Sequence, residues 1–267
     1  MSHVHEHNRR AWDERARRRR RHTRTATDQD LAAPLKGVDP EGWLGGDIQG
    51  WRVLCLAAGG GLQGLLYAAA GAVVTVVDIS PAMLELDRQE AVRRGFKLTL
   101  VEASMDDLSM LDGGGFDLVI QPVSTCYVPD VAPVYREVAR VLAPGGLYIS
   151  QHKQPVSLQA DAVPAPRGYV LGEPYFRNGP LPPAVDGLMH REAGTLEFLH
   201  RWDELLGQLC RSGFVIEDVS EPRHDDPQAE PGTAPHRYCY APPYIKIKAR
   251  RVGVPADVES RRRLWTP

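Results

Sequence analysis

Residues 53–64 read VLCLAAGGGLQG and residues 73–80 read VVTVVDIS, and these two stretches decide the fold. The apolar run 53–56 predicts a short buried strand, and the glycines at 59–61 predict the turn that leaves it. The β-branched run of the second stretch predicts a parallel strand ending at Asp78. Glycines in such a turn let the backbone approach a ligand, and a carboxylate after the next strand accepts both hydroxyls of a ribose. The two stretches therefore predict a nucleotide-binding α/β fold.

Outward from this unit, the chain continues to alternate strand-like and helix-like segments. Ser80 can cap a helix that begins at Pro81 and stops at Gly95, because proline loses no hydrogen bond at the first helical position. Another helix is expected from Leu62 to Gly71, and a further one, capped by Asp130, runs to about Leu142. Further strands are expected over residues 97–101, 116–120 and 147–151. This alternation predicts βαβ units on a parallel sheet.

The pattern changes after residue 154. Residues 155–194 are rich in proline and glycine and show little periodicity, which indicates a long insertion. Helical spacing returns over residues 196–211, and the last two strands are expected over 214–219 and 244–249. We expect a single domain made of an N-terminal helical cap segment (1–48), a core (49–154 and 196–251) and a substrate-side insertion (155–195).

Composition argues against several classes of function. The chain has 267 residues and a formal net charge of -2, so its overall charge favours neither nucleic acid nor an anionic membrane. The longest apolar runs are too short to span a bilayer, and the N-terminus lacks the apolar region of a secretory signal. The four cysteines show no Cys/His ligand spacing, which indicates reduced thiols and no metal site. We expect a cytoplasmic protein without a membrane partner.

Five segments together resemble the ordered motifs of class I (Rossmann-like) S-adenosylmethionine-dependent methyltransferases of the small-molecule type. They are VLCLAAGGGLQG (53–64), VVTVVDIS (73–80), EASMDDLSML (102–111), FDLVIQPVSTCYVPD (116–130) and VLAPGGLYIS (141–150). GFVIEDVSEP (213–222) and YIKIKARR (244–251) are similar to the family's closing hairpin. The resemblance implies an α/β fold, a Rossmann-like three-layer sandwich. Its seven-stranded, mostly parallel sheet would end in a C-terminal antiparallel hairpin, with an N-terminal helical cap and insertions outside the core.

Position by position, the resemblance implies a binding site for S-adenosylmethionine. Asp78 would hold the ribose, and the chain leaving the fourth strand would lie beneath the sulfonium. The cofactor residues that it implies are Ala57, Ala58, Gly59, Gly61, Asp78, Ile79, Met83, Ser104, Met105, Asp106, Gln121 and Pro122. Where the family commonly has an acidic residue and Gly-x-Gly, this chain has Cys55 and Ala57-Ala58. The missing carboxylate removes one polar contact to the amino-acid end of the cofactor.

Tyr127 and His152 follow the fourth and fifth predicted strands, at the edge where open α/β sheets bind ligands. Both are candidate catalytic residues, and both also fit a structural role. An imidazole titrates near neutral pH, so His152 can take the proton of a hydroxyl, amine or thiol acceptor. Trp12 resembles part of the N-terminal helix that covers the cofactor in many relatives, and Tyr175 and Tyr238 are candidate substrate walls.

The function predicted is methyl transfer to a small-molecule acceptor whose methylated atom the sequence leaves open, with S-adenosylhomocysteine as the product. One alternative is an RNA methyltransferase that uses the five arginines from Arg17 to Arg21, although neighbouring acidic residues favour a solvated helix face. A second is a non-catalytic S-adenosylmethionine-binding protein. An NAD-dependent oxidoreductase would need GxGxxG and a hydride-transfer set, which the sequence lacks. The sequence predicts no oligomeric state.

Overall fold

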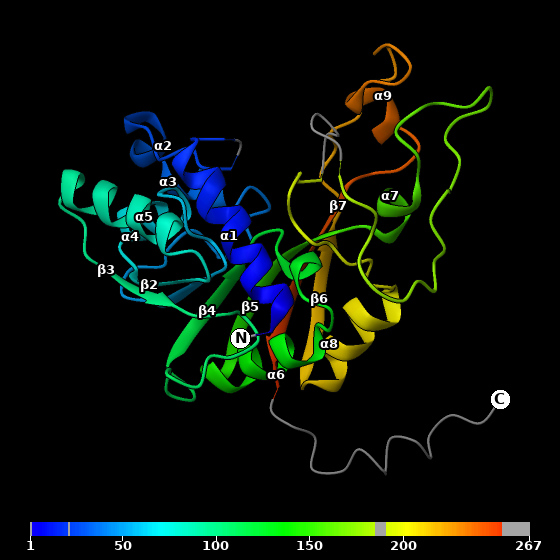
Figure 1. The fold of residues 1–267 in the computed structure, drawn as a ribbon. Helices are drawn as coiled ribbons and strands as arrows, with labels where there is room; N and C mark the ends of the chain where they lie inside the picture. Colours follow the sequence, from blue (N-terminus) through cyan, green and yellow to red (C-terminus); the bar gives the residue numbers. More distant parts are fainter. Residues whose placement is uncertain (1, 21, 185–190, 253–267) are drawn as a thin grey trace, which may run out of the picture.

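The computed structural model describes residues 2–20, 22–184 and 191–252, and within them the backbone forms a seven-stranded sheet (Figure 1). Its strands are β1 (Arg52–Leu56), β2 (Val73–Asp78), β3 (Leu98–Glu102), β4 (Phe116–Gln121), β5 (Leu142–Lys153), β6 (Phe214–Ser220) and β7 (Tyr244–Arg251). The order across the sheet is β3-β2-β1-β4-β5-β7-β6. Strands β1 to β5 are parallel, whereas β7 runs antiparallel to both β5 and β6. The predicted sheet and its closing hairpin are confirmed.

Helices cover both faces of the sheet. They are α4 (Gln63–Ala69) and α5 (Pro81–Arg94) on one face, and α6 (Ala132–Val141) and α8 (Gln208–Arg211) on the other. Alternate residues of β1 point to opposite faces, so Cys55 packs in the same cluster as Tyr67 of α4, while Leu54 packs in that of Val138 of α6. This alternation explains the continuous apolar run of β1 and produces the expected three layers.

The start and end of α5 follow its local sequence signals. The Ser80 hydroxyl accepts the Met83 amide at 3.1 Å, and Pro81 occupies the first helical position. Gly95 ends the helix in the left-handed conformation, with φ of 75°, where a side chain would be strained. These features hold β2 and α5 in a fixed relation, which positions Asp78 at their junction.

One predicted helix is wrong over its first half. Residues 196–200 are not helical, and the helix begins only around Trp202, with a π-helical turn over Asp203–Gly207 that leads into α8. The cause is long-range pairing, because the Phe198 amide donates to the Cys126 carbonyl at 2.7 Å. Asp130 accepts the amide of Ala132 from outside helix α6, as expected of a residue that precedes the helix, and Val131 lies between Asp130 and the first helical residue.

The N-terminal segment and the insertion lie on the side of the sheet where the parallel strands end. The segment contains α1 (His3–Arg17), α2 (Asp28–Ala32) and α3 (Pro34–Val38), and α1 packs against α5 and the turn Thr125–Tyr127. The insertion and the loop before β7 form a lobe with α7 (Pro155–Gln159) and α9 (Ala234–Tyr238) (Figure 1). Buried Arg237 joins the two parts of the lobe through the carbonyls of Ser157, Ala160 and Asp161.

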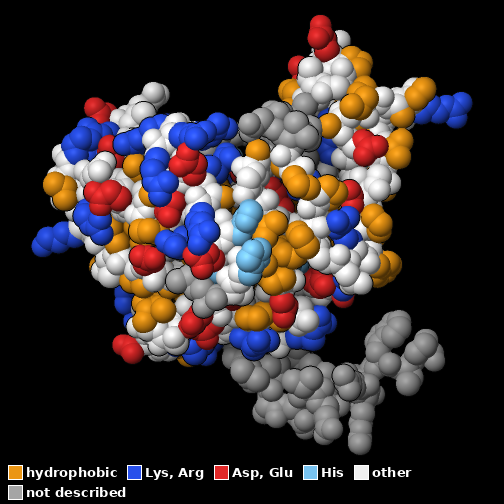
Figure 2. Space-filling model, viewed as in Figure 1, with side chains coloured by type: hydrophobic (Ala, Val, Ile, Leu, Met, Phe, Trp, Pro, Cys, Tyr) orange, Lys and Arg blue, Asp and Glu red, His pale blue; other side chains and the backbone are white. Residues whose placement is uncertain are grey.

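Charges of both signs are mixed on the surface around the N-terminal segment (Figure 2). Within the arginine run, Arg17 lies 3.1 Å from a Glu14 oxygen and Arg18 lies 2.6 Å from the other. Arg21 lies outside the described residues. The paired arginines give no support to the RNA alternative. No helix among the described residues has both the length and the apolar character needed to cross a bilayer.

Candidate active site

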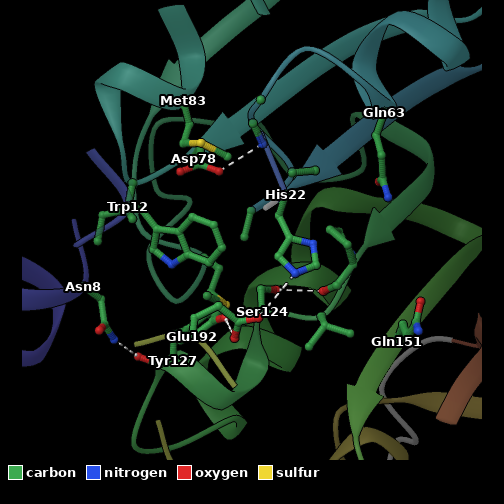
Figure 3. A pocket seen from close by; sticks show the side chains of 18 of the residues that line it. Asn8, Trp12, His22, Gln63, Asp78, Met83, Ser124, Tyr127, Gln151 and Glu192 are labelled. Atoms are coloured by element: carbon green, nitrogen blue, oxygen red, sulfur yellow. Dashed lines mark hydrogen bonds and ion pairs between the residues drawn. The ribbon is translucent and has the colours of Figure 1, made fainter. Parts of the chain in front are cut away.

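A cavity of about 500 Å³ opens where β1, β2 and β4 end, beneath α1 (Figure 3). Ligands of open α/β sheets bind at this edge. Of the site residues expected from sequence, those lining the cavity are Trp12, Ala57, Ala58, Gly59, Asp78, Ile79, Met83, Ser104, Met105, Pro122 and Tyr127. Those outside its lining are Gly61, Asp106, Gln121, His152, Tyr175 and Tyr238. The structure therefore brings together most of the cofactor set and one of the two catalytic candidates.

The glycine turn brings backbone close to the end of β2. A Cβ atom at Gly59 would lie 2.9 Å from Cβ of Met83 and 3.0 Å from an oxygen of Asp78, so only glycine fits there. Ala57, which stands where the family commonly has the first glycine, adopts φ of 49°, a conformation that glycine would take at lower cost. Ala57 therefore preserves the path of the turn despite the change from the family pattern.

Asp78 is held by backbone on both sides. One carboxylate oxygen accepts the Gly59 amide and the other accepts the Ser80 amide, each at 2.9 Å. Burial, partly offset by these hydrogen bonds, raises the pKa of Asp78 to about 6. The carboxylate lines the cavity with lone pairs still available, which suits it to accept hydroxyl groups of a ligand (Figure 3).

Asp87 is a residue of the site's framework that the sequence analysis missed. It is fully buried in α5, and its two oxygens accept the amides of Gly60 at 2.8 Å and Gly61 at 3.1 Å. The helical spacing of the sequence could have indicated it, because Asp87 falls on the same buried face of α5 as Met83 and Ala91. A carboxylate buried there needs a hydrogen-bond partner. Asp87 fixes the glycine turn from behind.

We expect Asp87 to make the ligand-free protein less stable as pH rises. Burial raises the pKa of Asp87 from the ordinary value of 3.8 to about 7, despite opposing hydrogen bonds from Gly60 and Gly61. Folding then favours the protonated carboxyl, so this stabilising contribution is complete below pH 3.8 and is lost as pH rises through about 7. Urea unfolding across this range should show a fall in the free energy of unfolding that is smaller in Asp87→Asn. An equal fall in both proteins would contradict this role.

Several residues expected in the site lie outside the cavity lining and contact other parts of the protein. The Asp106 carboxylate pairs with His5 at 2.9 Å, and Gln121 lies buried, donating to the Ser124 hydroxyl. Tyr175 accepts the backbone amide of Trp202, and Tyr238 meets the ring of His224 edge-on, and His224 does line the cavity. Of the expected pair Ser104 and Asp106, only Ser104 lines the cavity.

His152 is poorly placed to act as a base. Its side chain is 1% exposed, and its ring nitrogens are each 2.8 Å from a hydroxyl oxygen, of Thr125 and of Ser150. Burial, together with nearby His200, lowers the pKa of His152 to about 3. These contacts correct the expectation that His152 faces an acceptor, since its lone pair is already used in the protein interior.

We therefore expect His152→Ala to act on stability and not on proton transfer. Two buried hydroxyl groups would lose their partner, at about 1–3 kcal/mol each. The melting temperature should fall, while kcat for methyl transfer and its pH profile stay within about threefold of wild type. A large loss of kcat with an unchanged melting temperature would restore His152 to the catalytic set.

Helix α1 closes the cavity through Asn8, Trp12 and Asp13, whose contacts reach from one wall of the cavity to the other. The Asn8 side chain donates to the carbonyls of Tyr127 and Leu196, at 2.9 and 3.0 Å. Trp12 meets the Tyr127 ring edge-on with centroids 5.5 Å apart, and Asp13 accepts the Ser80 hydroxyl at 2.6 Å. The helix is thereby fastened at both walls, with Trp12 between them (Figure 3).

The far wall contains Glu192, which the sequence analysis did not single out. Glu192 comes from the end of the insertion and accepts the Tyr127 hydroxyl at 2.6 Å. No local pattern marks a glutamate in that segment, because its partners lie far away in sequence. Among the described residues, no group of three or more His, Cys, Asp and Glu side chains is arranged to hold a metal ion.

Comparisons with known proteins agree with this site. Residues 54–150 match the family described as methyltransferase domain. The uncharacterized methyltransferase YbaJ of Bacillus subtilis is 34% identical over 224 residues, covering 79% of this chain and 87% of that protein. A ubiquinone biosynthesis O-methyltransferase of Xanthomonas oryzae is 34% identical over 105 residues, covering 39% of this chain and 44% of that protein.

Solved structures share the fold. An S-adenosylmethionine-dependent methyltransferase from Mesorhizobium loti aligns with a TM-score of 0.62 and 27% identity, covering 77% of this chain and 93% of that one. Geranyl diphosphate C-methyltransferase from Streptomyces coelicolor aligns with a TM-score of 0.61 over 94% of this chain and 99% of its own. At 16% identity the second likeness concerns the fold alone.

Proposed function

Because the chain belongs to the class I S-adenosylmethionine-dependent methyltransferases, we propose that it binds this cofactor beneath α1 and methylates a small organic acceptor. The observation that carries the proposal is the placement of Asp78. Its buried carboxylate lines the cavity at the end of β2 and is oriented there by the amides of Gly59 and Ser80. A carboxylate so placed can accept both hydroxyls of the cofactor's ribose.

The walls of the cavity fit S-adenosylmethionine better than a dinucleotide. Dinucleotides place a pyrophosphate on the free amides of the glycine turn. Here the amides of Gly60 and Gly61 both donate to Asp87 and are not free to bind a phosphate. Ile79, Met83 and Met105 supply the apolar surfaces that an adenine ring needs.

The bound sulfonium would supply an already activated methyl group, so the chain's tasks are positioning and exclusion of water. Trp12, carried by α1, covers the cavity, and Pro122 lines it where the chain leaves β4. Tyr127 is fixed by its hydrogen bond to Glu192 and by the ring of Trp12, so its ring forms a rigid wall for the acceptor. These groups would hold acceptor and methyl in line.

The acceptor class follows from the remaining lining. Val123, Val128 and Tyr244 give this part of the cavity an apolar character, which suits a small organic molecule. The named relatives include an O-methyltransferase and a C-methyltransferase, so the kind of methylated atom is not common to the fold.

Calorimetry and product analysis test the proposal. S-adenosylmethionine should bind, whereas NADH should not. A screen of small phenols, thiols and carboxylic acids should then find acceptors that release S-adenosylhomocysteine. Tight binding without turnover on any acceptor would support the non-catalytic alternative, and the absence of binding would refute the proposed function altogether.

A further inference from the structure

The cavity wall formed by the insertion carries Glu192, a carboxylate within a cluster of charged side chains. Glu192 lies 2.7 Å from Nζ of buried Lys153, and its other oxygen lies 3.4 Å from Nε2 of His22 (Figure 3). Burial opposes ionisation of Glu192, but the Lys153 ammonium and the hydrogen bond from His22 bring its pKa below the ordinary value. Lys153 also lies 3.1 Å from Glu197, which in turn lies 3.2 Å from Nε of Arg191, so two cations balance the two carboxylates. A carboxylate is thus held beside an imidazole inside the cavity.

His22 is the first residue of a short segment, residues 22–26, which crosses the glycine turn and is called the strap below. The Ala26 amide donates to the Gly61 carbonyl at 2.8 Å, and buried Thr23 donates through its hydroxyl to the Arg20 carbonyl at 2.6 Å. The backbone of His22 has φ of 71°, in the left-handed region that a residue with a side chain seldom adopts. Such strain persists where the surroundings impose it, often at functional sites.

The contact with Glu192 selects one form of the His22 ring. A carboxylate only accepts hydrogen bonds, so the Nε2 that approaches it must carry the proton in the neutral ring. Nδ1 then keeps its lone pair. The side chain is 44% exposed, which gives a proton taken by the ring a route to water. The other titratable groups that line the cavity are His5, Arg24, Asp78, Tyr127, His224 and Tyr244.

We propose that His22, oriented by Glu192, is the general base of methyl transfer and that the acceptor is a phenol-type hydroxyl. This inference rests on the proposed function. A phenol joins an apolar ring, which fits beside Trp12 and Val128, to a hydroxyl proton that an imidazole can remove. The carboxylate holds the ring in place and stabilises the imidazolium that forms.

The transfer step balances in atoms and charge. The acceptor oxygen forms a bond to the methyl carbon, the carbon–sulfur electron pair stays on sulfur, and the hydroxyl proton passes to Nδ1 of His22. One positive charge thereby moves from the sulfonium to the imidazolium, beside Glu192. The proton then leaves to solvent.

A binding experiment tests the base without turnover. The protein loaded with S-adenosylhomocysteine is titrated with para-nitrophenol, whose anion absorbs visible light. In wild type the anion band should appear at a lower pH than in free solution, because His22 takes the proton. His22→Gln should bind the phenol but lose this shift, and Glu192→Gln should reduce it. His3→Gln, on the exposed start of α1 and outside the cavity lining, is the matched control and should behave as wild type.

Turnover provides the second test. His22→Ala should lower kcat with unsubstituted phenol, whose hydroxyl stays protonated at neutral pH, by about 10²- to 10⁴-fold, the usual contribution of a general base. The affinity for S-adenosylhomocysteine should stay within about threefold, and added imidazole should restore part of the rate, which a merely structural residue would not allow.

Each outcome separates this inference from the function on which it rests. Failure of wild type to bind S-adenosylhomocysteine overturns the proposed function. If the cofactor binds but para-nitrophenol does not, or binds without a shift, the phenol-and-base inference is wrong while the proposed function stands. Unchanged kcat in both His22 variants would also overturn it.

Discussion

Replacing Asp78 with alanine is expected to weaken binding of S-adenosylmethionine by about 10²- to 10⁴-fold. The carboxylate would lose two hydrogen bonds to the ribose, and bonds to a charged group contribute about 1.5–3 kcal/mol each, with about 1.4 kcal/mol for every tenfold change. The replacement also frees the amides of Gly59 and Ser80, which loosens the turn. Calorimetry with S-adenosylmethionine measures the affinity directly.

Two further variants separate the ligand contact from damage to the turn. Asp78→Asn keeps one acceptor oxygen, so it should fold better than the alanine variant and still bind weakly. Asp117→Asn removes a carboxylate near the start of β4, where it pairs with Arg52 on the surface, and should leave affinity unchanged. Wild-type affinity in Asp78→Asn would remove the ribose contact from the site.

The fold was predictable because its decisive signals are local. Ser80, Pro81 and Gly95 begin and end α5 through contacts within the helix itself. The β-branched run 73–77 became the largely buried parallel strand β2. The helix expected over 196–211 was wrong in its first half because Phe198 pairs with Cys126, a contact that no periodicity within the segment contains.

The residues of the site also differ in whether a local sequence signal identifies them. Asp78 follows from a motif in which turn and carboxylate are neighbours in sequence. His22 and Glu192 are far apart in sequence and meet only when the strap and the insertion both reach the cavity. His152 occupies a suitable position in the strand pattern, yet Thr125 and Ser150 enclose it. The position of a residue after a predicted strand indicated that it lies near the ligand-binding edge of the sheet, but it did not indicate which histidine faces the cavity.

Asp13→Ala is expected to raise the dissociation rate of S-adenosylhomocysteine by roughly 10- to 100-fold. Asp13 is buried and accepts the Ser80 hydroxyl at 2.6 Å and the Ala82 amide at 3.2 Å, which fastens α1 to the start of α5. Loss of these charge-assisted hydrogen bonds reduces the stability of the closed position of α1, relative to an open one, by a few kcal/mol. Stopped-flow release measures the rate, and hydrogen exchange over residues 3–17 should increase. Glu14→Ala, on the exposed side of α1, should change neither.

Asp13→Ala should also change how the affinity for the cofactor depends on pH, and this change tests whether the charge of Asp13 acts on Asp78. Burial is the main reason for the raised pKa of Asp78, and the negative charge of Asp13 adds to it. Without Asp13 this pKa should fall, so Asp78 stays ionised, and the cofactor stays bound, to lower pH than in wild type. Asp13→Ala should therefore release ligand faster at neutral pH while its affinity declines at a lower pH on acidification. Faster release with an unshifted acid limb would show that Asp13 fastens α1 but that its charge does not act on Asp78.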